Sequence, residues 1–222
     1  NYQTIEEVIR NQLIVDEGDP LNNLLFNKSI NQIRSLRIFK EVKSSINEGS
    51  NENLKIVDII VEEQPTGEIS LLAGIGTAGK SIGGGITEKN FLGKGINLDT
   101  NLEVSEETIA GRFVYSKPNF AYTDNTLFTS VKATTSDFLT DSGYKVKETG
   151  FSLGTTYEQY ENLFFSPEVS LSLEDLETNH TASSQRQKQE GTYEDFYFNY
   201  GLNYDLRDST YRPTSGNKTS FY

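Results

Sequence analysis

The 222-residue sequence has 32 acidic and 20 basic residues, a net charge of −12, and 35% hydrophobic residues. The acidic excess argues against a nucleic-acid partner, which requires a basic face. The chain has no cysteine, which excludes disulfides, thiolate chemistry and cysteine-based metal sites. No apolar run reaches the roughly 18–20 residues of a transmembrane helix. A mean hydropathy of −0.53 is still compatible with transmembrane strands, because only alternate residues of such strands face lipid.

Residues 1–64 are expected to begin with two helices. Thr4 and Glu7 have the spacing of a capping box, which predicts that Thr4 opens the first helix. A second helix is expected from about Asn22 to Leu36. The apolar positions at helical spacing are Ile5, Val8, Ile9 and Leu13 in the first helix and Phe26, Ile30 and Ile33 in the second.

Two strands are expected to follow, at Phe39–Ile46 and Leu54–Glu62. The second is apolar on both faces, which predicts a central position in a small sheet covered by the helices. One strand of this sheet is expected before Asn1. Pro65-Thr66-Gly67 marks the boundary of this unit.

Beyond Gly67 the hydrophobic period changes to two residues, which is typical of strands. We expect about eight strands and the start of a ninth near Lys218. The alternation is clearest in 96–104, 109–115, 163–174 and 196–206, and weaker in 151–157.

This alternation fits a transmembrane barrel or a soluble β-sandwich, and three features favour the barrel. The expected strands have about 10–16 residues, against about 5–6 in globular proteins. Aromatic side chains are expected near strand ends, at Phe196, Phe198 and Tyr204. Connections are expected to alternate between tight turns, as at Asn125, and long loops, as at 178–191.

Several motifs, in order, resemble the BamA family, within the superfamily of outer-membrane insertases and transporters that join POTRA domains to a β-barrel. The resemblance covers nearly the whole chain. Its motifs are Ser35–Val42, in which Ile38 replaces the usual glycine, Val57–Glu63, Ala73–Thr77, Glu88–Gly95, Lys117–Phe120 and Tyr204–Gly216.

The resemblance implies that residues 1–64 are the last POTRA domain of a series, with the order β-α-α-β-β and its first strand cut off. It implies that residues 65–222 are the first eight to nine strands of a sixteen-stranded antiparallel outer-membrane barrel. The expected location is the outer membrane of a Gram-negative bacterium, with residues 1–64 in the periplasm and a signal peptide in the precursor. The expected partners are unfolded β-barrel substrates, lipoproteins of the Bam complex and membrane lipid.

In this family the first barrel strand pairs weakly with the last, and the resulting seam opens sideways. The resemblance assigns that strand to Leu72, Gly74, Ile75, Gly76 and Gly79. Glycines weaken a strand, so this seam could accept an incoming substrate strand by β-augmentation. The glycines could equally mark bulges and tight curvature.

Two further sites are expected in residues 1–64. An edge strand with Lys40, Val42, Lys43 and Ser45 could bind a passing chain, or it could be a solvated edge protected by lysine. The acidic turn Asp16, Glu17 and Asp19 resembles a lipoprotein contact of the family, or it could be ordinary charge at a helix end.

No enzymatic activity and no cofactor are expected. The single histidine, His180, lies in a polar stretch and is expected in a loop. Gly83–Gly85 is not followed by the Lys-Ser/Thr that a phosphate-binding loop needs.

Three other functions remain open. The chain could belong to a two-partner-secretion transporter, to a three-POTRA paralogue of the same superfamily, or to a passive porin-like barrel.

Overall fold

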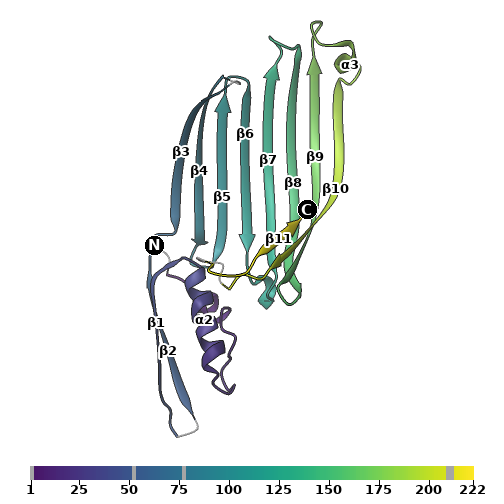
Figure 1. Ribbon diagram of the computed structural model, residues 1–222. Coiled ribbons are helices and arrows are strands. Elements are labelled where there is room, and N and C mark those ends of the chain that lie inside the picture. Colours follow the sequence, from purple (N-terminus) through teal and green to yellow (C-terminus); the bar gives the residue numbers. More distant parts are fainter. Residues whose placement is uncertain (1–2, 52–53, 77–78, 209–212) are drawn as a thin grey trace.

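The computed structural model describes residues 3–51, 54–76, 79–208 and 213–222. It contains a small α/β unit and a tall antiparallel sheet, with the small unit at the lower end of the sheet (Figure 1). The small unit comprises α1 (Glu6–Arg10), α2 (Asn23–Ser35), β1 (Phe39–Glu48) and β2 (Lys55–Glu63). The expected order of helix, helix, strand and strand is confirmed.

One face of α2 forms the core of the small unit. Ile33 is fully buried, and Phe26 and Ile30 beside it are less than 8% exposed. Val8, Ile38, Phe39 and Val42 complete the cluster. The helix begins where expected, because the Asn22 side chain accepts hydrogen bonds from the backbone N–H groups of the first turn.

The expected capping box of the first helix is wrong. Ile5 occupies the N-cap position, and no side chain caps it. The Thr4 hydroxyl instead accepts a hydrogen bond from Asn90 Nδ2 at 2.8 Å. Thr4 is thus engaged with the large sheet, and α1 has only five residues.

The expected central position of the second strand stays a prediction, because it depends on the strand expected before Asn1. In the part of the small unit that the structure describes, the sheet contains only β1 and β2. Ile56 and Ile60 of β2 are 52% and 64% exposed. Ile59 and Val61 pack against the core, so one face of β2 is covered and the other is open.

The large sheet has nine strands in chain order, each antiparallel to its neighbours. This confirms the expected eight strands and the start of a ninth. The strands are β3 (Gly67–Gly76), β4 (Gly79–Phe91), β5 (Ile96–Ser105), β6 (Thr108–Lys117), β7 (Thr126–Phe138), β8 (Tyr144–Tyr160), β9 (Leu163–Thr178), β10 (Gly191–Asp205) and β11 (Lys218–Phe221).

The connections do not alternate between short and long as expected. Asn125 ends an irregular connection, 118–125, that contains the 3-10 helix η1 (Phe120–Tyr122). The tight turn 161–162 and the long connection 206–217 lie at the same end of the sheet. The expected long loop between β9 and β10 is present and contains α3 (Ser184–Gln187).

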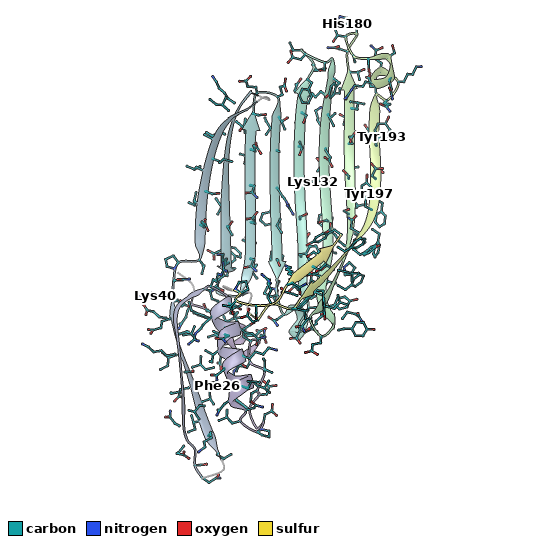
Figure 2. All side chains as sticks on the ribbon, in the orientation of Figure 1. Phe26, Lys40, Lys132, His180, Tyr193 and Tyr197 are labelled. Atoms are coloured by element: carbon teal, nitrogen blue, oxygen red, sulfur yellow. The ribbon has the colours of Figure 1, made fainter. Side chains whose placement is uncertain are left out.

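Among the described residues, no helix has the length and apolarity needed to cross a membrane. His180 lies in the β9–β10 loop, at the end of the sheet farthest from the small unit (Figure 2). This is the position expected for a loop histidine.

Candidate functional site

One face of the large sheet carries apolar side chains across eight strands. Residues that are directly opposite in an antiparallel pair share a face, so the register traces rows across the sheet. One such row is Ile69, Ile86, Thr100, Phe113, Val131, Phe151, Leu171 and Phe196. Its seven apolar side chains are each at least 40% exposed. An exposed apolar surface of this extent indicates contact with lipid or with another protein.

The opposite face is polar in the neighbouring row. That row is Ser70, Gly85, Asn101, Arg112, Lys132, Gly150, Ser172 and Asp195. Lys132 pairs with Glu148 of the next strand, and Ser172 donates to the same carboxylate at 3.1 Å. The strands therefore separate an apolar face from a hydrogen-bonded polar face, as in a barrel with lipid outside and water inside.

The apolar band is tall on β9. On the apolar face of this strand, the side chains from Leu163 to Leu173 are apolar, and Asp175 follows. At about 3.3 Å per residue, ten steps span about 33 Å along the strand. With the roughly 40° tilt of outer-membrane strands, this corresponds to about 25 Å of membrane thickness, the height of a typical lipid-facing band.

Charged and aromatic residues bound this band. At the upper end Lys147 forms ion pairs with Asp175 and Glu177. At the lower end Tyr204 is 44% exposed near the end of β10. Of the three aromatic residues expected near strand ends, Tyr204 has that position, whereas Phe196 and Phe198 lie in the middle of β10.

The apolar band is much shorter on β4. On the apolar face of this strand, only Ile82, Gly84 and Ile86 lie between Lys80 and Glu88. The four steps from Ile82 to Ile86 span about 13 Å. The apolar band is therefore less than half as tall on β4 as on β9, whereas on β3 it runs from Ile69 to Ile75, six steps or about 20 Å.

The candidate seam residues Leu72, Gly74, Ile75 and Gly76 lie on β3, and Gly79 begins β4. The outer edge of β3 has no partner strand among the described residues. Leu72 and Ile75 are 72% and 85% exposed. Four of the five candidate residues therefore lie on the edge strand of the described sheet, and their role in a seam stays a prediction.

Glycine dominates the pairing of β3 with β4. Six of the ten register pairs contain at least one glycine, and Gly76 pairs with Gly79. Only two of the fourteen pairs between β8 and β9 do so. Side-chain pairs across strands contribute roughly 0.2–1 kcal/mol each, so the β3–β4 hairpin is held by fewer such contacts.

The strand proposed to bind a passing chain is β1. Val42 is buried in the core, whereas Lys40 and Lys43 pair with Glu62 and Glu41. The hydrogen bond from Lys40 lowers the pKa of Glu62. Ser45 is exposed opposite Asp58. Lys40 and Lys43 are paired with carboxylates but remain exposed, and the binding of a chain at β1 stays a prediction.

The acidic turn is partly used within the small unit. Glu17 accepts a hydrogen bond from Arg10 Nη1 at 2.9 Å, and Asp19 accepts one from the backbone N–H of Asp16 at 3.1 Å. Glu17 is nevertheless 84% exposed. The turn therefore keeps its negative charge at the surface.

The contact between the small unit and the sheet was not predicted. The Ile5 N–H donates to the Gly93 carbonyl at 2.9 Å. Asn90 also accepts a hydrogen bond from the Gly95 N–H at 2.7 Å, which shapes the β4–β5 turn. The Glu-Lys-Asn motif at 88–90 was the only sequence signal, and it indicated a turn without indicating its partner.

The described residues contain no group of histidine and carboxylate side chains that could hold a metal ion.

A family model for the Omp85 superfamily domain matches residues 90–222. A curated protein of Treponema pallidum (strain Nichols), named provisionally as an outer membrane protein assembly factor, is 31% identical over 110 residues. That match covers 47% of this chain and 13% of the relative, so the chain spans only a small part of that protein.

Solved structures share the fold at low sequence identity. BamA from Haemophilus ducreyi lacking POTRA domains 1–3 aligns with a TM-score of 0.76 and 22% identity, over 98% of this chain and 45% of that chain. CdiB from Escherichia coli aligns with a TM-score of 0.59 and 15% identity, over 91% of this chain and 40% of that chain. CdiB from Acinetobacter baumannii aligns with a TM-score of 0.56 and 12% identity, over 99% of this chain and 44% of that chain.

Proposed function

The chain belongs to the Omp85 superfamily, and from this premise we propose that it is part of an outer-membrane protein assembly factor. The proposed function is to fold and insert other β-barrel proteins into the bacterial outer membrane. The relative from Treponema pallidum has a name of this kind, and nearly the whole of this chain aligns with 45% of the chain of a BamA structure.

In this proposal β3–β11 are the first strands of a transmembrane barrel, with the apolar face in lipid and the polar face toward the lumen. The band of about 25 Å on β9 matches the height of a lipid-facing band. Residues 1–64 are proposed to be a periplasmic POTRA domain. The order of two helices and two strands, and the direct attachment to the lower end of the sheet, support that assignment.

The observation that carries the proposal is the construction of the β3 edge. Its hairpin with β4 is rich in glycine, and the apolar bands on β3 and β4 are shorter than the band on β9. A strand with unpaired backbone groups can add another strand by hydrogen bonding, irrespective of that strand's side chains. An apolar band that is shorter on β3 and β4 than on β9 would thin the bilayer locally, which eases the entry of a polar hairpin.

The two sites in the small unit belong to the same proposal. The backbone edge of β1 would receive the substrate chain before it reaches the seam. The acidic turn around Glu17 would bind a basic patch on an accessory lipoprotein, and the charge reversal Glu17→Lys should then reduce co-purification of that lipoprotein. Unchanged co-purification would remove the turn from the proposal.

The seam is tested by locking it in the full-length protein. A cysteine at Gly74, paired with one on the strand that closes the barrel, should stop assembly of an unfolded barrel substrate in proteoliposomes when oxidised. Reduction should restore it. Gly74 is suitable because a Cβ there would meet only Ser81 Oγ, at 3.4 Å.

The matched control locks two strands that are already paired. Asn101 of β5 and Arg112 of β6 are directly opposite, so the disulfide of N101C/R112C should leave assembly unchanged. Normal assembly by the oxidised seam variant would refute the seam.

A transporter of the same superfamily is the second candidate, because the sheet also aligns with the CdiB chains. The lower TM-scores make it the weaker of the two. Proteoliposomes that export one partner polypeptide without assembling barrels would favour it. A three-POTRA paralogue would assemble barrels in the same assay, and a porin would only pass small solutes.

A further inference from the structure

A cavity of about 470 Å³ lies between the small unit and the lower end of the large sheet. Val8 and Asn11 line it from the small unit, and Asn97 and Asn119 line it from the sheet. Gln12 Nε2 and Asn119 Oδ1 are 3.5 Å apart across this junction. The cavity therefore exists only because the two parts of the chain are docked.

Three lysines surround the cavity. Lys89, Lys94 and Lys117 all line it, with one carboxylate, Glu7. None of the three forms an ion pair within the described part of the chain, whereas other lysines, on β1, β2, β7 and β8, do. In a protein with a net charge of −12, such a local excess of positive charge favours an anion.

The position of the cavity indicates which anion. Lys117 follows Tyr115 by two residues, and Tyr115 shares the apolar face with Leu98. The lysines thus lie just below the apolar band, at the level of the lipid headgroups. Basic side chains at that level attract anionic phospholipids.

We propose that this lysine-lined cavity binds the phosphate group of an anionic phospholipid, such as phosphatidylglycerol, from the leaflet next to the small unit. The bound headgroup neutralises the lysines and bridges the small unit to the sheet. This inference rests on the proposed membrane location of the sheet.

The test uses the full-length protein in vesicles of phosphatidylcholine with or without phosphatidylglycerol. After extraction, retained lipid is counted by native mass spectrometry. The unaltered protein should retain phosphatidylglycerol in preference to phosphatidylcholine. The variant K89Q/K94Q/K117Q should lose this preference, by on the order of fivefold per lysine.

A matched control removes the same charge elsewhere. Lys28, Lys188 and Lys218 are exposed and do not line the cavity, so K28Q/K188Q/K218Q should keep the preference. Equal retention by both variants would overturn the proposal. Complete displacement of the lipid by inorganic phosphate would also overturn it, because the site would then hold free phosphate.

The outcome is separable from that of the proposed function. If the protein does not insert into vesicles, the membrane location itself is wrong. If all variants insert and only the lipid preference is missing, the membrane location stands and the headgroup site is wrong.

Discussion

If the apolar face of the sheet lies in lipid, the loss of stability caused by a charged substitution on it depends on depth in the membrane. A soluble fold would not show this dependence. Val169 lies near the middle of the apolar band on β9, six residues from Leu163 and four from Leu173. At about 3.3 Å per residue and a tilt of about 40°, its side chain is about 15 Å from one end of the band and about 10 Å from the other. Val169→Arg therefore places a charge near the centre of the bilayer.

We expect Val169→Arg to destabilise the membrane-inserted protein by about 2–4 kcal/mol, the cost of an arginine at the midplane. Leu173→Arg, at the upper limit of the band beside Asp175, should cost about 0–1 kcal/mol. Ser170 follows Val169 on β9, so its side chain lies on the polar face. Ser170→Arg should therefore change stability by about 0.5 kcal/mol or less.

The assay is reversible urea unfolding of the full-length protein in phospholipid vesicles, followed by tyrosine fluorescence. The prediction is the order of the three variants, because only a bilayer makes the cost depend on depth along one face. An equal loss at Val169 and Leu173, or a larger loss at Ser170, would refute the assignment of this face to lipid.

Three other predictions concern packing, a loop and pH. Ile33→Ala should cost the small unit about 2–5 kcal/mol, because Ile33 is fully buried; hydrogen exchange of α2 should accelerate accordingly, and the exposed Leu24→Ala should leave exchange unchanged. Gly143→Ala should displace the β9–β10 loop, because Gly143 has a φ of +77° and an added Cβ would lie 2.3 Å from the Ala182 nitrogen. Faster proteolysis of residues 178–190 would show this displacement. The control Gly111→Ala should leave proteolysis unchanged, because a Cβ added at Gly111 would have its nearest neighbouring atom at 3.9 Å. Hydrogen bonding from the Thr4 side chain and from the Thr4 backbone N–H lowers the pKa of the Glu63 carboxyl group. Its stabilising contribution is therefore complete above the ordinary glutamate pKa and is lost as the pH falls through the lowered value. Amide exchange at Thr4 should show this transition, and Glu63→Gln should abolish it; an unchanged pH profile in that variant would contradict the assignment.

Local patterns predicted the elements whose formation depends on local contacts. Asn22 as a helix cap and the row of Phe26, Ile30 and Ile33 follow directly from helical geometry. The strands of the large sheet follow from alternation, because one face is apolar and the other polar. Lys218 as the start of the ninth strand is confirmed in the same way.

The errors arose where a residue has a partner far along the chain. Thr4 has the spacing of a capping residue, but its hydroxyl binds Asn90, 86 positions away. The shortening of the apolar band on β4 becomes visible only when the register aligns Ile82–Ile86 with neighbouring strands. A single sequence does not specify register, so the cavity between the small unit and the sheet was not predicted either.

The docking of the small unit has a mechanical consequence for the edge of the sheet. Thr4 and Ile5 are bonded to Asn90 and Gly93, at and just beyond the end of β4, and Thr66 is bonded to Glu88 of the same strand. A rotation of the small unit would have to break these hydrogen bonds or displace β4. Strand β4 is paired with β3, the edge strand of the described sheet. A displacement of the small unit would therefore act directly on the glycine-rich β3–β4 hairpin.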